Sequence, residues 1–255
     1  MVGRGGQTLN YRCSKKILTP SARFEKFAAH TELNKVKMRT KTLLLTAALC
    51  AAGVATSMAQ GVFSVNTVGY VNVDVKPGFQ LVANPLRNEG NMTVSQLFKN
   101  VQGGVPAGMQ VFAFNGTSFQ TATYDDLENN FLGSGANVVV EPGEGVFVRN
   151  PRNTDIRITF VGEVQTGTIQ NPLPAGFSIK SSEVPIDGTA TSLGFPGAAG
   201  DQIFKFNSTT QAYQTFNFDD LEGGWLPSAP TINVGEAVFV RKAAAGTWTQ
   251  TFNIQ

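Results

Sequence analysis

Apolar and polar residues alternate with a period of two along most of the chain beyond residue 67. Val71, Val73 and Val75 alternate with polar residues, which predicts a β-strand with one buried and one solvated face. The same alternation recurs several times, and glycine and proline separate the runs. Only Thr93–Phe98 has a helical pattern, since Thr93 and Gln96 form a capping-box signature. Many short strands between turns predict an all-β sandwich or barrel.

The chain contains one long motif twice. QVFAFNGTSFQTATYDDLENNFLG at 110–133 is matched by QIFKFNSTTQAYQTFNFDDLEGGWLP at 202–227, and EPGEGVFVRN at 141–150 by NVGEAVFVRK at 233–242. This repetition predicts two tandem, pseudo-symmetric β-sandwich or barrel-like units of about 95 residues, each with at most one short helix. We place them at 60–164 and 165–255. No Gly/Pro/Ser-rich linker separates them, so we expect a rigid pair.

The repeated motif also suggests which side chains are buried. Phe112 and Phe114 share one face of the predicted strand, and Ala113 lies on the other. Because Lys205 replaces Ala113 in the second copy, we expect that face in solvent and the phenylalanines in the core. The Asn-Gly pair at 115–116 predicts a hairpin with a type I′ turn.

The N-terminal region has the pattern of a secretory signal. Residues 38–59 combine Arg39 and Lys41 with the apolar run Leu43–Ala55 and a small-residue exit at Ser57–Ala59. The apolar run is shorter than the roughly 20 residues that a membrane-spanning helix needs, so we expect cleavage before Gln60 and no transmembrane segment afterwards. Residues 1–37 are interpreted as an upstream artefact or a disordered extension. The protein is therefore expected to be extracytoplasmic.

Removal of the leader changes the charge and the available chemistry. From Gln60 onward the chain has ten basic and sixteen acidic residues, a formal charge of −6, which argues against a nucleic-acid partner. Both cysteines and the only histidine, Cys13, Cys50 and His30, precede that point. Catalysis by Ser-His-Asp or Cys-His is thereby excluded in the mature chain. Zinc and haem sites are disfavoured for the same reason.

Two acidic loops carry the first candidate chemistry. Three carboxylates within four residues are a possible oxygen-ligand set for calcium, although the spacing is not that of an EF-hand. The alternative is that the aspartates turn the chain while Leu127 and Leu221 fill the core. The candidate ligands are Asp125, Asp126, Glu128, Asp219, Asp220 and Glu222. No other cofactor is expected.

Aromatic residues beside these loops suggest a second chemistry. Rings next to carboxylates can hold a polysaccharide by stacking on its C–H faces, whereas the alternative is ordinary packing in a β core. The candidate rings are Trp225, Phe131, Tyr124 and Phe218.

A third possibility is glycoside hydrolysis, which needs two carboxylates but no histidine. Glu144 and Glu236 have the required residue type. The alternative is that they brace the fold through pairs with Arg149 and Arg241.

The motifs VFAFNG and EPGEGVFVRN, with the preceding NPL at 84–86, resemble a recurring unit in an uncharacterised family of secreted Gram-negative bacterial proteins with duplicated NPL…PGEGFFV-type β units. The second copy departs from this pattern, because Ser-Ser-Glu-Val-Pro stands where the first has Ala-Asn-Pro-Leu. The resemblance implies an extracytoplasmic β fold and no established activity.

These observations favour a secreted or cell-surface protein of structural or interaction type, without a catalytic site, that binds an extracellular polymer or an envelope protein. A carbohydrate-binding module, with or without calcium, is the alternative. A carboxylate-based glycosidase is the third possibility.

Overall fold

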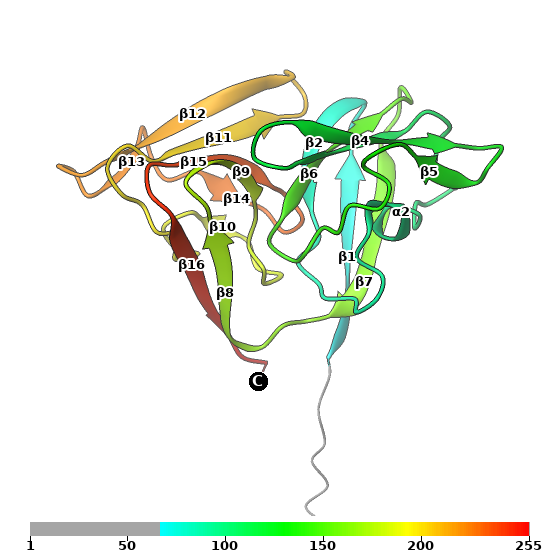
Figure 1. Ribbon diagram of the computed structural model, residues 1–255. Helices are drawn as coiled ribbons and strands as arrows, with labels where there is room; N and C mark the ends of the chain where they lie inside the picture. Colours follow the sequence, from blue (N-terminus) through cyan, green and yellow to red (C-terminus); the bar gives the residue numbers. More distant parts are fainter. Residues whose placement is uncertain (1–66, 255) are drawn as a thin grey trace, which may run out of the picture. The chain divides into compact units, whose positions relative to one another are not determined.

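A computed structural model describes residues 67–254, which all fall within one compact unit of the chain (Figure 1). The predictions for residues 1–37 and for the signal at 38–59 lie outside the described residues. Below, residues 67–164 are the N-terminal half and residues 165–254 the C-terminal half.

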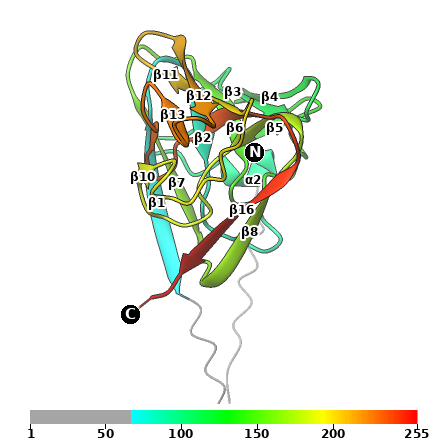
Figure 2. The same ribbon diagram turned by 90° about the vertical axis from the view of Figure 1, so that its left-hand side faces the viewer.

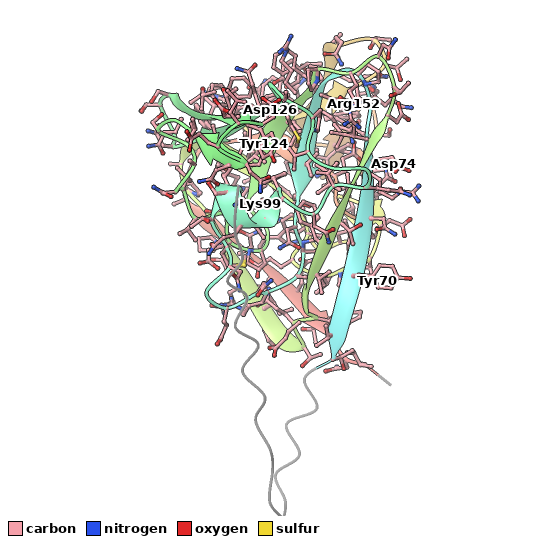
Figure 3. All side chains as sticks on the ribbon, turned by 90° about the vertical axis from the view of Figure 1, so that its right-hand side faces the viewer. Tyr70, Asp74, Lys99, Tyr124, Asp126 and Arg152 are labelled. Atoms are coloured by element: carbon pink, nitrogen blue, oxygen red, sulfur yellow. The ribbon has the colours of Figure 1, made fainter. Side chains whose placement is uncertain are left out.

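The N-terminal half consists of a two-stranded ribbon and a five-stranded antiparallel sheet. In the ribbon, β1 (Val68–Val75) pairs with β7 (Ile156–Glu163). The sheet has the order β2 (Gly78–Ala83), β6 (Gly145–Asn150), β3 (Gln110–Phe114), β4 (Phe119–Asp125) and β5 (Asn130–Leu132). Tyr70 and Asp74 project from β1 away from the core (Figure 3). The predicted all-β class is therefore confirmed.

The C-terminal half has the same arrangement. β8 (Gly167–Leu173) pairs with β16 (Gly246–Phe252), and this ribbon extends away from the sheet in Figures 1 and 2. The second five-stranded sheet has the order β9 (Gly176–Lys180), β15 (Val238–Lys242), β11 (Gln202–Asn207), β12 (Ala212–Asp219) and β13 (Gly224–Leu226). A separate two-stranded sheet, formed by β10 (Gly188–Thr189) and β14 (Thr231–Ile232), also belongs to this half. Strand for strand, the two sheet orders correspond.

The predicted short helix is present as α2 (Val94–Leu97) in the N-terminal half. Gln96 Oε1 accepts hydrogen bonds from the backbone N–H of Thr93 at 3.2 Å and from its hydroxyl at 2.6 Å. This cap orients the helix so that Val94 and Leu97 enter the core.

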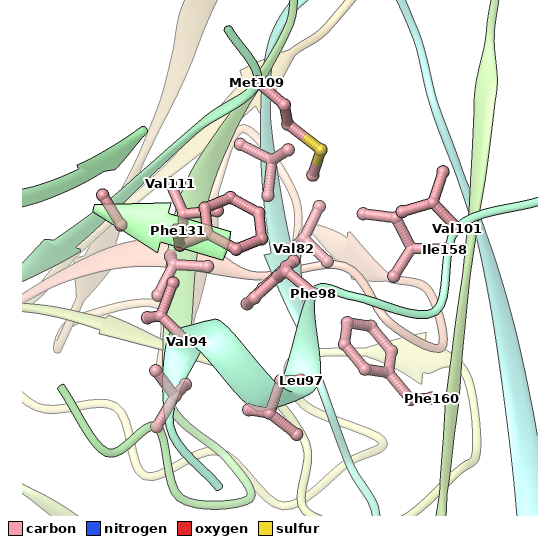
Figure 4. Close-up of a cluster of buried hydrophobic side chains, with 14 of the residues drawn as sticks. Val82, Val94, Leu97, Phe98, Val101, Met109, Val111, Phe131, Ile158 and Phe160 are labelled. Carbon is pink, nitrogen blue, oxygen red and sulfur yellow. The ribbon is translucent and has the colours of Figure 1, made fainter. Parts of the chain in front are cut away.

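The core of the N-terminal half lies between the β1–β7 ribbon and one face of the sheet, which we call the inner face. Val111 is fully buried there, and Phe98 of the α2 C-cap packs edge-on against Phe160 of β7, with ring centroids 5.6 Å apart (Figure 4). Because Val71 and Val73 are buried in the same cluster, the alternating pattern of β1 is explained by packing on one side only.

The core of the C-terminal half is built around Trp248. Its indole is completely buried and donates a hydrogen bond from Nε1 to the carbonyl oxygen of Leu193 at 2.7 Å. Phe195 packs against this ring with centroids 5.1 Å apart, and Ile203 of β11 closes the cluster. The only polar atom of the largest side chain in this core therefore has a hydrogen-bond partner.

The prediction of which face of β3 is buried was wrong. Ala113 is 5% exposed and faces the core, whereas Phe112 and Phe114 lie half-buried on the opposite, outer face. Lys205 lies on the inner side of β11, but its long side chain carries the ammonium to polar partners instead of into the core. It donates to the carbonyl oxygen of Thr231 at 2.6 Å and pairs with a glutamate at 3.1 Å. A lysine with a long apolar stem does not mark a solvent face.

The hairpin between β3 and β4 is confirmed, but its turn differs from the prediction. Four residues, 115–118, connect the strands, and only Gly116 has a positive φ, of 97°. Asn115 Oδ1 accepts backbone N–H bonds from Thr117 and Ser118 at 3.1 and 2.8 Å. The asparagine side chain thus closes the turn itself, so the type I′ geometry is not needed.

Reciprocal contacts join the two halves. The backbone N–H of Ala83 donates to Gly235 at 2.9 Å, and that of Ser181, the position corresponding to Ala83, donates to Gly143, which corresponds to Gly235, at 2.9 Å. Corresponding residues exchange roles in this way across an isologous interface, as in a two-fold dimer. Between them lies a small apolar cluster of Leu81, Ala83, Ile179 and Ala237.

Candidate functional site

The outer faces of the two five-stranded sheets together carry a group of ten aromatic residues, which we call the aromatic face. Five positions of the N-terminal half contribute, and the five corresponding positions of the C-terminal half do the same. The strands that carry them lie along the upper side of the molecule in Figures 1 and 2. The residues are Phe79, Phe112, Phe114, Phe119 and Phe147, and Phe177, Phe204, Phe206, Tyr213 and Phe239.

The aromatic face follows the same reciprocal pattern as the backbone contacts between the halves. Phe147 packs edge-on against Phe206 of the other half with centroids 5.3 Å apart, and Phe239 packs against Phe114 at 5.4 Å. Phe147 and Phe239 also contact each other at 6.1 Å. These two rings therefore form the centre of the face, and each edge-to-face pair adds about 0.5–1.5 kcal/mol beyond area burial.

The outer rings of the face remain open to solvent. Phe79 is 37% exposed, Phe119 and Phe177 are each 44% exposed, and Tyr213 is 48% exposed. Desolvation among the neighbouring rings raises the pKa of the Tyr213 phenol, so this hydroxyl stays protonated through the neutral range. Contiguous exposed apolar surface of this kind marks interaction sites on soluble proteins.

Two hollows open on the aromatic face. The larger has a volume of about 560 Å³ and is lined by Phe79, Phe112, Phe119, Phe147, Phe206 and Gln211. Its polar lining residue is already engaged: Gln211 Oε1 accepts from the backbone N–H of Phe79, and Nε2 donates to its carbonyl, both at 2.9 Å. The hollow therefore offers apolar ring surface and few free hydrogen-bonding groups.

The smaller hollow occupies the corresponding place in the C-terminal half. It has a volume of about 290 Å³ and is lined by Phe177, Phe204, Tyr213 and Phe239. Tyr213 stands where the N-terminal half has Phe119, so this hollow contains one phenolic oxygen that the larger one lacks.

Each half carries one arginine on the same outer face, as the cross-strand neighbour of a ring that lines its hollow. Arg149 lies directly opposite Phe79 in the β2–β6 register, and Arg241 lies opposite Phe177 in the β9–β15 register. Both are exposed, and both donate to neutral oxygens: Arg149 Nη1 to Gln110 Oε1 at 3.4 Å, and Arg241 Nη1 to the Gly200 carbonyl at 3.3 Å. Each half thus places beside a lining ring a cation that has no carboxylate partner within residues 67–254.

The acidic loops turn the chain, as the alternative to calcium binding predicted. Asp125 Oδ1 accepts backbone N–H bonds from Leu127 at 2.9 Å and Glu128 at 3.2 Å. Asp219 does the same for Leu221 at 2.8 Å and Glu222 at 3.1 Å. The first aspartate of each loop is therefore occupied in holding the turn.

The remaining groups of these loops point outward. Asp126, Glu128, Asp220 and Glu222 are exposed. Within residues 67–254, no three acidic, histidine or cysteine side chains lie close enough to hold a metal ion. Leu127 and Leu221, which were expected to fill the core, are instead 91% and 93% exposed. That prediction was wrong because the turn directs both leucines into solvent.

The four rings predicted to stack on a sugar do not form a platform. Trp225 is 5% exposed, Phe131 1% and Tyr124 8%, and Phe218 is half-buried. Phe218 and Trp225 are cross-strand neighbours that pack against each other with centroids 5.3 Å apart, as Tyr124 and Phe131 do at 5.2 Å. All four belong to the inner side of the sheets, so the prediction of an exposed platform at these residues is corrected.

The predicted Glu–Arg braces are also absent among the described residues. Glu144 lies 3.9 Å from Lys180, and Glu236 lies 3.1 Å from Lys205. Each glutamate is five residues from its expected arginine, and an odd spacing along an extended chain places the two side chains on opposite faces. The carboxylates therefore meet lysines of the inner side, while Arg149 and Arg241 stay on the aromatic face.

A buried polar cluster lies where the halves meet, and the sequence did not reveal it. Lys180 is buried, and its Nζ donates to Asn171 Oδ1 at 3.2 Å. Desolvation lowers the pKa of Lys180, and desolvation raises the pKa of Glu183. A hollow of about 660 Å³ reaches this cluster, with Arg87 and Glu144 also on its wall. The cluster joins the halves through Asn171, which donates to the Gly143 carbonyl at 3.2 Å.

No known protein family, curated protein or solved structure matches this chain. Among residues 67–254, no helix has the length and apolar character needed to span a membrane.

The sequence contains one signal for the aromatic face, the recurrence of aromatic residues in both copies. Aromatic residues recur at the same five positions of both copies, but only the pair on β3, Phe112 and Phe114, was predicted to be buried, and it was assigned to the core. A core was already available from the valines, isoleucines and tryptophans of the inner face. Two apolar faces on one strand therefore indicate a second packing surface, of which only part is covered by the other half.

Proposed function

We propose that this chain is an exported structural or interaction protein of the bacterial envelope, without a catalytic site, and that the aromatic face is its binding surface. The observation that carries the proposal is the contiguous set of partly exposed rings at corresponding positions of both halves. We also infer that the chain arose by duplication of one β unit, because the sequence motifs, the sheet orders and the reciprocal contacts all correspond.

The chemistry of the face favours an apolar partner surface over a sugar. Phenylalanines line nearly all of the larger hollow, and its glutamine amide is already bonded to backbone. A polysaccharide needs free polar groups for its hydroxyls, whereas an apolar surface needs only ring area. Exposed aromatic and arginine side chains are also the residues enriched in protein interfaces. An envelope protein is thus the better-supported partner, and an extracellular polymer is the second candidate.

The experiment compares three forms of the full chain as immobilised bait. Phe119→Ser combined with Phe177→Ser removes one exposed ring from each half, and Leu127→Ser removes an equally apolar but unrelated exposed side chain. Envelope extracts of the producing bacterium and an array of envelope and extracellular glycans serve as prey. The double variant is expected to lose the partner that the wild type and Leu127→Ser retain.

The same experiment also has a contradicting result. If all three forms capture the same partners with equal yield, and circular dichroism shows that all three are folded, the aromatic face is not the binding surface. Retention of a glycan by the double variant would instead favour a polymer site elsewhere on the chain.

A further inference from the structure

The two hollows of the aromatic face have the size and lining of a site for an acyl chain. Ligand pockets commonly enclose roughly 300–1,000 Å³, and the larger hollow, of about 560 Å³, falls within this range. Five phenylalanines line it, and the amide of its one polar lining residue, Gln211, is already bonded to the backbone of Phe79. An unbranched hydrocarbon chain gains free energy from such a lining without leaving a polar group unsatisfied.

Arg149 places a positive charge beside one of the lining rings. Arg149 is two residues from Phe147 on the same strand, so both side chains leave the same face of the sheet. Cross-strand pairing also places it opposite Phe79. Its guanidinium donates to a neutral amide oxygen at 3.4 Å, a long contact that a carboxylate would replace with a charge-assisted pair. A ligand that covers these rings therefore gains most when its head group is anionic and planar.

The second half repeats this arrangement. Arg241 is two residues from Phe239 and lies opposite Phe177, and its guanidinium donates to a backbone carbonyl at 3.3 Å. The hollow beside it is about half as large and contains the phenol of Tyr213. Both halves thus place a cation beside a ring that lines an apolar hollow, and the hollow of the N-terminal half is the larger.

We infer that the aromatic face binds a free fatty acid, with the acyl chain across Phe79, Phe112 and Phe119 and the carboxylate at Arg149. The inference rests on the proposed binding role of this face and adds a small-molecule ligand to the envelope protein proposed above. The smaller hollow beside Arg241 is the weaker of two corresponding sites. A bilayer fits less well, because the rings line hollows and the most exposed of them is still about half covered.

The test uses isothermal titration of the full chain with dodecanoate below its critical micelle concentration. Arg149→Gln removes the cation and is expected to weaken binding at the tighter site about tenfold, since hydrogen bonds to charged groups have roughly this effect. Arg152→Gln is the matched control: this exposed arginine also donates to a neutral oxygen, the Gly104 carbonyl, but lies outside the face. Dodecanol is expected to bind the wild type and Arg149→Gln equally.

Chain length and a ring variant probe the apolar part. Each methylene removed between dodecanoate and octanoate is expected to weaken binding about fourfold, from about 0.8 kcal/mol per buried CH₂. Phe119→Ser is expected to reduce affinity for dodecanoate and dodecanol alike. Circular dichroism confirms that each variant is folded.

Several outcomes would overturn the inference. These are the absence of binding heat with dodecanoate at two well-separated temperatures, equal binding by Arg149→Gln and wild type, or binding to anionic phospholipid vesicles but not to free dodecanoate. Sedimentation that shows a dimer dispersed by Phe119→Ser but not by dodecanoate would assign the face to a second copy. If dodecanoate fails while the double variant still loses its envelope partner, the proposed function stands and only the fatty acid is excluded.

Discussion

Lys242 and Asp201 form the most deeply buried ion pair among the described residues. Their side chains are 5% and 0% exposed, and Lys242 Nζ also donates to the Pro196 carbonyl at 2.8 Å. Asp201 accepts backbone N–H bonds from Ala198 and Ala243, both at 2.9 Å, so every polar atom of the pair has a partner. A pair of this kind is stabilising only while both members are present.

Lys242→Met should therefore destabilise the protein by about 3–5 kcal/mol, because it leaves the Asp201 carboxylate buried without its cation. Urea unfolding followed by circular dichroism measures this loss. Lys99→Met, at an exposed lysine (Figure 3), is the control and should change stability by less than about 0.5 kcal/mol. An equal small effect of both substitutions would contradict the described pairing.

Glu183 should make stability depend on pH. Desolvation raises its folded-state pKa above the ordinary value, opposed by the hydrogen bond from Gln165 and by the charges of Lys180 and Arg87. Between the ordinary and the raised pKa the folded protein holds a proton that the unfolded chain has lost. The free energy of unfolding therefore falls as pH rises through this window.

Glu183→Gln is expected to remove that decrease. Urea titrations at intervals from about pH 4 to about pH 8 would show a flatter profile for this variant than for the wild type. Glu89→Gln, at an exposed glutamate, should leave the profile unchanged. A wild-type profile that rises across the same window would contradict the assignment. Lys180 acts in the alkaline range, where its lowered pKa makes stability rise with pH.

At the scale of elements, the acidic loops are turns held by one aspartate each. Asp219→Ala removes the acceptor for the N–H groups of Leu221 and Glu222 and should cost about 1 kcal/mol. Asp220→Ala, next to it and exposed, should cost almost nothing. Thermal unfolding with and without calcium completes the test. A rise in melting temperature with calcium that Asp219→Asn abolishes would restore the metal-site hypothesis.

The sequence pattern was sufficient for the elements but not for their two faces. Alternation at Val71, Val73 and Val75 and the cap at Thr93 predicted β1 and α2 correctly, because local spacing alone determines which residues can be buried together. The choice between faces of β3 failed because both faces are apolar. The correct choice depends on a tertiary property, because the other half covers only part of the outer face.

The candidate site was predicted in the wrong place for a related reason. Trp225 and Phe131 follow conspicuous acidic loops, yet cross-strand pairing turns both rings into the cores. The residues of the aromatic face are spread over about 160 positions, and only the sheet order and the reciprocal contact between halves bring them together. No local motif contains that information.

At the scale of the whole molecule, the junction of the halves depends on Gly145, where there is no room for a side chain. A Cβ on Gly145 would overlap the Cβ of Ala237 and a methyl group of Ile179. Gly145→Val should therefore force the halves apart and cost about 3 kcal/mol, as overpacking of a core does. Gly224→Val, at a strand position with open space around it, is the control and should be nearly neutral. Equal unfolding midpoints for both variants would contradict the described junction.

Tryptophan fluorescence tests the central claim most directly, namely that the corresponding aromatic positions of the two halves form an open binding face while the rings beside the acidic loops are core. Trp225 and Trp248 are the only tryptophans, and both are buried. The wild type should therefore emit at short wavelength and resist quenching by acrylamide. Tyr213→Trp should add a red-shifted component that acrylamide quenches and that a bound partner or dodecanoate protects. Ready quenching of the wild type, or an unquenched Trp at position 213 in the free protein, would contradict the account.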